Sequence, residues 1–293
     1  LVVRLKLMSN LDISEKRLPQ DGRFNLRLTH HNIDVRVSTM PVQHGECVVM
    51  RILDQTEGIR ELTNVGMPSS YIQRFRTIIT RPHGLVLVTG PTGSGKTTTL
   101  YGALNELNTP QRKIITVEDP VEYRLPRISQ VQIHEKIGLD FASVLRASLR
   151  QDPDILLIGE IRDAESAEIA LRAAMTGHLV LSTLHTNDAV TSALRLVDMG
   201  VDPYLVASSL RAIVAQRLVR KVCDSCSEPY RLNAIEQRLF ASIKPHSHGE
   251  TKFRVGSGCA HCFNTGYRGR IGVFELLELN AAMADALREN NVR

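Results

Sequence analysis

Short apolar runs alternate with segments of helical periodicity through the middle of the chain. Near-continuous Val, Ile and Leu runs predict strands buried on both faces, as in a parallel sheet. Helices between such strands would cover both faces of the sheet. The predicted strands are 85–89, 114–118, 154–159 and 179–184, with an edge strand at 128–133, and the predicted helices are 96–107, 141–150, 164–175, 189–198 and 203–216.

The first part of the chain follows a shorter period. Phe24, Leu26 and Leu28 alternate with polar residues, and the apolar positions Val35 and Val37 follow. This alternation predicts a small β-rich unit. Further expectations are a short helix capped by Ser14, strand residues at 48–52, a linker with a short helix at 55–67 and a helix at 68–81.

The last part is punctuated by Cys, Gly and Pro over 221–275 and closes with a predicted helix at 280–291. Two Cys-x-x-Cys pairs stand there, and four thiolates in two such pairs suit tetrahedral Zn²⁺ in a structural site. The fifth cysteine, Cys47, is expected to be a small buried residue. The expected zinc ligands are Cys223, Cys226, Cys259 and Cys262.

Composition narrows the class of protein. The chain has 293 residues, is 43% hydrophobic and 23% charged, and contains no run long enough to cross a bilayer. No signal peptide is visible. The chain begins at Leu1 rather than Met, so we expect a fragment that has lost an N-terminal portion. A formal charge of +5 and the absence of Trp disfavour nucleic acid as a direct ligand.

A phosphate loop follows the first buried strand and precedes a predicted helix. Its glycines let backbone N–H groups converge on phosphate, its lysine adds a positive charge, and its threonine hydroxyl is a ligand for Mg²⁺. The phosphate would lie at a helix N-terminus. The expected nucleotide-binding residues are Gly90, Pro91, Thr92, Gly93, Ser94, Gly95, Lys96, Thr97 and Thr98, with Thr97 also ligating Mg²⁺.

Polar residues end the other predicted strands at the same edge, where ligands of open parallel sheets bind. Glu118 ends the second strand and Glu122 lies just beyond it, Glu160 follows the third strand, and His185 ends the fourth. Glu160 either orients a metal-bound water or acts as a base, and Glu118 and Glu122 are the other candidates for polarising the attacking water. We favour Glu160 on the Mg²⁺ side and Glu118 near the water.

His178 and His185 flank the fourth strand. Seven residues of strand span about 23 Å, so both side chains cannot reach one γ-phosphate. We expect His185 to sense the γ-phosphate, whereas His178 would lie at the far end of the strand, at a subunit contact. Arg23, Arg36 and Arg51 of the β-rich unit are either solvated surface groups or arginine fingers that reach a nucleotide.

Together with the phosphate loop, three segments resemble the secretion ATPase superfamily, and more narrowly the ATPases that power type II secretion and type IV pilus assembly. Residues 115–122 are similar to the aspartate box of that family. Residues 149–163 resemble its atypical Walker B segment, with Gly159 before Glu160, and residues 176–188 resemble its histidine box. Residues 17–23 and 34–41 look like its second N-terminal domain, and the four cysteines match its metal-binding insertion.

The resemblance implies a RecA-like phosphate-loop NTPase domain with a parallel sheet, after a small PAS-like α+β domain and before a four-cysteine zinc-binding and helical C-terminal region. It also implies a homo-hexameric cytoplasmic motor at the inner face of the bacterial inner membrane. There, ATP hydrolysis with Mg²⁺ works on a membrane platform protein, and Arg23 and Arg36 complete the site. Membrane association would run through partners. The implied boundaries are 1–57 for the second N-terminal domain, 58–67 for the linker, 68–220 for the ATPase domain, 221–275 for the metal-binding subdomain and 276–293 for the C-terminal helix.

Two rival functions use the same nucleotide core. One is a motor that translocates nucleic acid, and nucleic-acid stimulation of hydrolysis would support it. The other is a scaffold that binds nucleotide without hydrolysing it, against which the intact glutamates argue.

Overall fold

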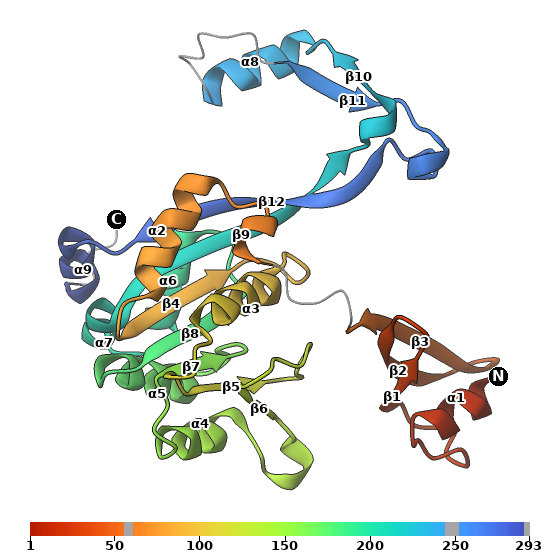
Figure 1. Cartoon of the computed structure of the whole chain (residues 1–293), viewed down its shortest axis with the longest axis horizontal. Helices are drawn as coiled ribbons and strands as arrows, with labels where there is room; N and C mark the ends of the chain where they lie inside the picture. The colour runs from red at the N-terminus through yellow and green to blue at the C-terminus, as the bar shows by residue number, and fades with distance from the viewer. Residues whose placement is uncertain (56–60, 244–251, 290–293) are drawn as a thin grey trace. The chain divides into compact units, whose positions relative to one another are not determined.

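The computed structural model describes residues 1–55, 61–243 and 252–289. The chain forms two compact units (Figure 1). The first consists of Leu1–Ile59 with Val121–Pro126, and the second consists of Arg60–Pro120 with Arg127–Arg293. Within the described residues, no helix is both long and apolar enough to cross a membrane.

The first unit is an antiparallel sheet with one short helix. Strands β1 (Gln20–Arg27), β2 (Asn32–Val42) and β3 (Gly45–Asp54) pair in the order β1-β2-β3, and α1 covers Val2–Met8. The buried side chains Val35, Val37 and Thr39 alternate along β2, as the period of two predicts. The β-rich unit expected from the pattern is therefore confirmed.

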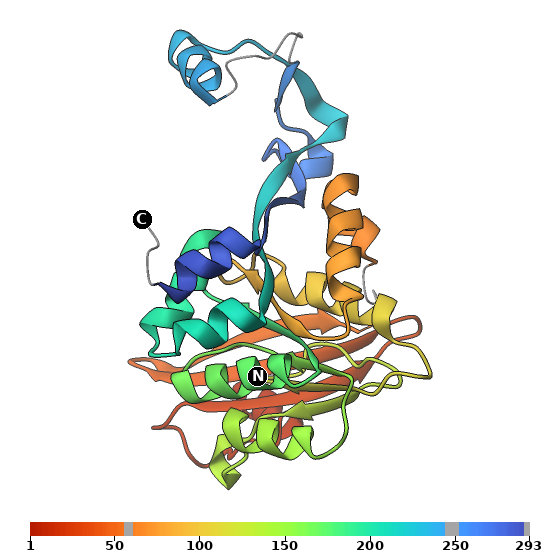
Figure 2. The ribbon, with the colours of Figure 1, turned by 90° about the vertical axis from the view of Figure 1, so that its left-hand side faces the viewer.

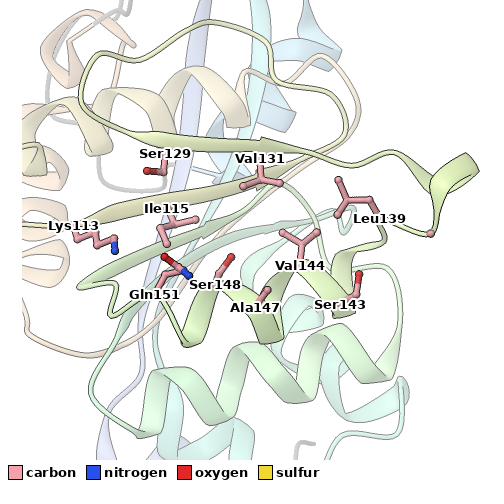
Figure 3. Close-up of a pocket in the computed structure, with 11 residues that line it drawn as sticks. Lys113, Ile115, Ser129, Val131, Leu139, Ser143, Val144, Ala147, Ser148 and Gln151 are labelled. Atoms are coloured by element: carbon pink, nitrogen blue, oxygen red, sulfur yellow. The ribbon is translucent and has the colours of Figure 1, made fainter.

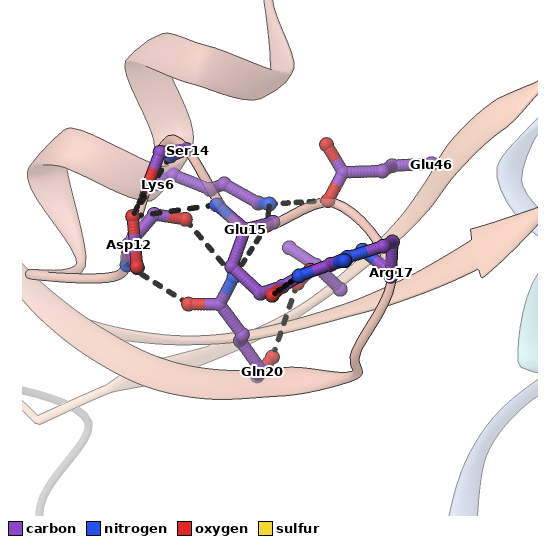
Figure 4. A network of polar contacts seen from close by, with 8 residues as sticks. Lys6, Asp12, Ser14, Glu15, Arg17, Gln20 and Glu46 are labelled. Carbon is purple, nitrogen blue, oxygen red and sulfur yellow. Dashed lines mark hydrogen bonds and ion pairs between the residues drawn. The ribbon is translucent and has the colours of Figure 1, made fainter.

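A buried lysine ties α1 to the sheet. Lys6 is only 1% exposed, forms an ion pair with Glu46, and donates from Nζ to the carbonyl oxygen of Glu15 at 2.7 Å (Figure 4). The helix that Ser14 is expected to cap is absent among the described residues, because Ser14 donates instead to Asp12 Oδ1 at 2.8 Å from its backbone N–H. The Asp12 carboxylate thus stabilises a turn in competition with a helix.

The expectation of a buried Cys47 is wrong, because this side chain is exposed. Cys47 pairs with Met40, which is 53% exposed, on the face of the sheet opposite the buried Val37. Side chains of a strand alternate between the two faces of its sheet, and Cys47 lies on the exposed face.

The second unit is built on a seven-stranded, mostly parallel sheet in the order β12-β9-β4-β8-β7-β5-β6. Only β12 runs antiparallel to its neighbour. The strands β4, β5, β7 and β8 are buried at every position, as near-continuous apolar runs predict. The strands are β4 (Gly84–Thr89), β5 (Ile114–Glu118), β6 (Ser129–Gln132), β7 (Ile155–Ile158), β8 (Leu179–Leu184), β9 (Leu210–Val222) and β12 (Tyr267–Glu278).

Helices cover both faces of this sheet (Figures 1 and 2). Helices α2 and α3 lie on one face, and α4 to α7 pack with α9 on the other, where their apolar side chains form the main core with β4, β5, β7 and β8. The helices are α2 (Ser69–Ile79), α3 (Lys96–Leu107), α4 (Phe141–Leu149), α5 (Ala164–Met175), α6 (Ala189–Asp198), α7 (Pro203–Ser209) and α9 (Ala281–Arg288), with 3-10 turns at Leu62–Asn64 and Glu135–Ile137.

The helix predicted at 203–216 is wrong beyond Ser209. The chain turns there into β9, which pairs with β4 on one side and β12 on the other. Ile213 and Val214 are buried and β-branched, and such residues favour a strand once neighbouring strands are available. Strand β12 is also absent from the prediction, because glycines such as Gly269 and Gly272 are typical of turns.

The long strands β9 and β12 continue beyond the sheet as a two-stranded ribbon (Figure 2). The ribbon leads to a small substructure in which β10 (Ser227–Tyr230) pairs with β11 (Phe253–Gly256). Helix α8 (Ala234–Ile243) lies between these strands in sequence, and Phe240 stacks edge-to-face on Phe253 with ring centroids 5.1 Å apart. Two 3-10 turns, Asp224–Cys226 and Ala260–Cys262, each end in one cysteine, and Cys223 and Cys259 directly precede them.

Candidate active site and metal centre

The phosphate loop joins the end of β4 to the start of α3. Gly90, Gly93 and Gly95 have φ values of 146°, 79° and 87°, which side chains other than glycine rarely adopt. A Cβ at Gly90 would lie 2.2 Å from the Gln216 carbonyl oxygen. Ser94 is 3% exposed, and its hydroxyl oxygen has no hydrogen-bond partner within the described residues. A buried, unsatisfied hydroxyl beside a loop of backbone amides fits a phosphate ligand.

Lys96 is folded onto the loop itself. Its Nζ donates to the carbonyl oxygens of Gly90 at 2.8 Å and Pro91 at 3.3 Å. Burial lowers the pKa of the Lys96 ammonium group, and the nearby charge of Glu160 opposes this shift. If Lys96 turns from these two carbonyl oxygens to a phosphate oxygen, its acceptor becomes charged, and the hydrogen bond becomes stronger. Thr97 and Thr98 follow in the first turn of α3, where Thr97 is exposed.

Gln216 supports the loop from β9, and sequence reasoning missed it. It is 3% exposed, and its Oε1 accepts from the Thr99 hydroxyl at 2.7 Å. A Cβ at Gly95 would lie 2.9 Å from its Nε2. The signal was a polar residue directly after the apolar run 212–215, but the helix predicted there concealed that it lies on a strand beneath the loop.

Glu160 and His185 meet at the carboxyl edge of the sheet. His185 Nε2 lies 3.2 Å from Glu160 Oε2, and the other carboxylate oxygen accepts from Arg162. Arg162 also donates to Asp119 at 3.2 Å, so it links the segments that follow β7 and β5. Its hydrogen bond to Glu160 raises the pKa of the Arg162 guanidinium. Two of the predicted site residues are thus brought together, with Arg162 as a further member.

Glu118 is also at this edge, but it is 3% exposed and surrounded by donors. Its carboxylate accepts from the hydroxyl groups of Tyr101 and Thr116, the latter at 2.5 Å, and from Gln130 Nε2 at 3.3 Å. Gly159 passes close by, since a Cβ there would lie 3.3 Å from the Glu118 Cα. This proximity explains a glycine immediately before Glu160.

Glu122 belongs to the first unit, together with the arginines. It accepts from Arg36 Nη2 at 2.6 Å, and Arg36 also donates to the Val121 carbonyl oxygen at 3.2 Å. Arg23 and Arg51 are the cross-strand neighbours of Arg36 on β1 and β3. The three arginines therefore form one row across the sheet.

His178 lies at the opposite end of β8 from His185. Its Nδ1 is 3.0 Å from the Ala173 carbonyl oxygen, at the turn that leads from α5 into the strand. The two histidines therefore do not share a site, as their spacing along the strand predicts.

The four cysteines of the two Cys-x-x-Cys pairs converge at the end of the β9–β12 ribbon. Their Sγ atoms all lie within 4.8 Å of one another, with Cys223 and Cys259 3.9 Å apart, Cys226 and Cys262 3.8 Å, and Cys259 and Cys262 3.7 Å. A tetrahedral zinc ion with Zn–S bonds of about 2.3 Å requires sulfur atoms about 3.8 Å apart. The donor set and its spacing therefore fit Zn²⁺.

Backbone amides favour the thiolate at Cys262, whereas burial raises the pKa of the neighbouring Cys226 thiol to about 12 in the absence of a metal. The N–H groups of Cys259 and Gly266 donate to Cys262 Sγ at 3.2 and 3.3 Å. Burial raises the pKa of the Cys262 thiol, but these hydrogen bonds and the neighbouring Cys259 and Cys226 thiols lower it to about 6. Hydrogen bonds donated to a thiolate stabilise the thiolate relative to the neutral thiol. The thiolate is the form of cysteine that binds a metal.

Known proteins are similar to this chain in sequence and in fold. Residues 1–293 match the family described as "Type II/IV secretion system protein". The chain is 51% identical over 287 residues to the type II secretion system ATPase E of Vibrio cholerae and 52% identical over 287 residues to the type II secretion system protein E of Dickeya dadantii. These matches cover 98% of this chain but 56% and 57% of the relatives, so the chain spans little more than half their length.

The structure is similar to the crystal structure of the pilus retraction motor PilT with bound ADP. The TM-score is 0.67 at 30% sequence identity, over 94% of this chain and 68% of that one. The likeness supports the predicted α/β fold with a mostly parallel sheet. With sequence and structure in agreement, this chain belongs to the type II/IV secretion system protein family.

Proposed function

We propose that this chain binds and hydrolyses ATP with Mg²⁺, as the nucleotide-driven part of a motor for type II secretion or pilus assembly. The observation that carries the proposal is the contact between Glu160 and His185 at the sheet edge where the phosphate loop follows β4. This contact places a carboxylate and an imidazole at the edge of the sheet that also carries a loop suited to phosphate. ATP hydrolysis at this edge is consistent with the matching family and with the similar structure that contains bound ADP.

Each residue of the site has a role that follows from its position. The loop amides and Lys96 bind the phosphates, and the Thr97 hydroxyl holds Mg²⁺, which would neutralise charge on the transferred group. Glu160 lies on the Mg²⁺ side, held in place by Arg162, and His185 responds to the γ-phosphate through its contact with Glu160. Glu118 remains our candidate for polarising the attacking water, with Tyr101 and Thr116 holding its carboxylate.

The proposal extends to the rest of the chain. Residues 68–220 form a RecA-like ATPase domain, residues 221–275 a metal-binding subdomain and residues 1–57 a PAS-like domain. The chain works as a homo-hexamer in the cytoplasm beside an inner-membrane platform protein. The arginine row, with Arg23 and Arg36, would complete a nucleotide site. Arg36 is held by Glu122, so reaching a nucleotide requires it to exchange one carboxylate for a phosphate. Zinc in the cysteine cluster is structural, because all four ligands come from the protein.

Substituting Glu160→Gln tests the proposal, because it keeps the size of the side chain and removes its charge. We expect phosphate release from Mg²⁺-ATP to fall by at least about 10²-fold, the usual cost of removing one group that stabilises charge in the transition state, while ADP binding persists. Glu165→Gln removes an exposed carboxylate from α5 and is the matched control. Wild-type turnover by the Glu160→Gln protein would contradict the role of this residue.

The same assay separates the rival functions. Tight ATP binding without turnover by the unmodified chain would indicate a scaffold, and hydrolysis stimulated several-fold by nucleic acid would indicate a translocating motor.

A further inference from the structure

A hollow of about 520 Å³ lies between strands β5 and β6 and helix α4 (Figure 3). Pockets that bind small molecules have volumes of about 300–1,000 Å³. The residues that line it include Lys113 and Ile115 on β5 and the loop before it, Ser129 and Val131 on β6, and a face of α4. None of its lining residues belongs to the phosphate loop.

The hollow is open to solvent, because Lys113, Ser129, Ser143, Ala147 and Gln151 of its lining are exposed. Ile115, Val144 and Ser148 are buried at about 4% exposure and form its least accessible part. The side chains that α4 contributes at Ser143, Ala147 and Ser148 are small, which leaves space beside the strands.

The two ends of the hollow differ in polarity. Figure 3 shows Lys113, Ser129, Ser148 and Gln151 around Ile115 towards one end, and Val131, Leu139 and Val144 with Ser143 towards the other, so the first end is the more polar. The ammonium group of Lys113 has no ion-pair or hydrogen-bond partner within the part of the chain that the structure describes. A ligand with a charged acceptor at one end and an apolar body would match this arrangement.

The hollow and the nucleotide groups use opposite faces of the same two strands. Ile115, Ser129 and Val131 line the hollow beneath α4, whereas the intervening Gln130 donates to Glu118, which also accepts from Tyr101 on α3. A ligand in the hollow would therefore not compete for the phosphate loop.

We propose that this hollow is a binding site for a small amphipathic carboxylate, with its head group at Lys113 and its apolar chain against Val131, Leu139 and Val144. The site is distinct from the nucleotide site and does not depend on hydrolysis.

Octanoate is a suitable probe, observed by saturation-transfer NMR on the whole chain. A ligand of this size is expected to bind with a dissociation constant of about 0.1–1 mM. Lys113→Met should weaken octanoate about tenfold or more and leave 1-octanol little changed. Ala147→Phe should abolish binding of both probes by filling the hollow.

Arg150→Met is the matched control, because it removes a positive charge from the residue after α4 outside the lining set, and it should bind octanoate like the wild type. Saturating ADP and the Lys96→Ala substitution should leave octanoate binding unchanged, which separates this site from the proposed nucleotide site. If Ala147→Phe fails to bind ADP and is therefore misfolded, Ser148→Leu replaces it. Displacement by ADP, equal binding to the filled variant, or no saturable binding to the wild type would overturn the proposal.

Discussion

At the phosphate loop, the groups that face a ligand are backbone amides and side chains from strand ends far apart in sequence. At the cysteine cluster, four side chains of one kind face each other. Among the residues that the structure describes, the Ser94 hydroxyl has no hydrogen-bond partner and Lys96 donates to the neutral carbonyl oxygens of Gly90 and Pro91. The cysteines instead approach one another at the spacing that one metal ion requires. The first arrangement suits a ligand that exchanges, and the second suits an ion that stays.

This difference predicts that each site can be removed without loss of the other. The phosphate loop is anchored in the sheet by β4, α3 and Gln216. The cysteines lie at the end of the β9–β12 ribbon, beyond the helices that cover the sheet (Figure 2). The same strand β9 serves both, with Gln216 near one site and Cys223 just after its end.

The largest expected effect is the loss of the metal. Protein purified without chelator should contain about one zinc ion per chain, and Cys262→Ser should remove it, with the loss of on the order of 10 kcal/mol of local folding free energy. Amide exchange in β10 and β11 should then accelerate while ADP binding persists. Cys47→Ser is the matched control and should retain zinc. A zinc-free wild type would contradict the metal site.

A smaller effect is expected from Lys96→Ala. Loss of hydrogen bonds from a charged donor to phosphate costs about 3 kcal/mol, so ATP should bind about 10²-fold more weakly in a titration with fluorescent nucleotide. Lys136→Ala, at an exposed position, should bind like the wild type. Zinc content should not change. Unaltered affinity in the Lys96→Ala protein would exclude the proposed phosphate contact.

The smallest effect is expected where β9 supports the loop. Gln216→Leu leaves the buried Thr99 hydroxyl without its acceptor, and the free energy of unfolding should fall by about 1–2 kcal/mol in urea denaturation. Adding Thr99→Val removes the other partner and should recover part of this loss. If the double variant is as unstable as the sum of the two single ones, the hydrogen bond does not couple these residues.

Local sequence predicted much of the second unit closely. The helices predicted at 96–107, 164–175 and 189–198 coincide with α3, α5 and α6. Asp163 and Asp188 cap the latter two by accepting from the backbone N–H groups of Ser166 and Thr191. Helix capping and apolar runs involve residues that are close together in the chain, so they can be recognised in a single sequence.

Strand β9 and the hydrogen-bond partners of Glu118 could not be predicted without the fold. The apolar run of β9 has no period that separates a buried strand from a buried helix, and only its pairing with β4 and β12 decides the matter. The same pairing places Gln216 beneath the loop. Likewise, Tyr101 on α3 and Gln130 on β6 donate to Glu118 on β5, and no pattern of neighbouring residues predicts these contacts.

The phosphate loop, the strands that end in polar residues and the four cysteines can be recognised without coordinates, because each is a pattern of neighbouring residues. Which of those residues meet depends on the fold. It joined Glu160 to His185, separated His178 from both, paired Glu122 with Arg36 and left a hollow beside α4. Side-chain distances across a sheet depend on strand order and register, which the spacing of residues along one chain does not specify.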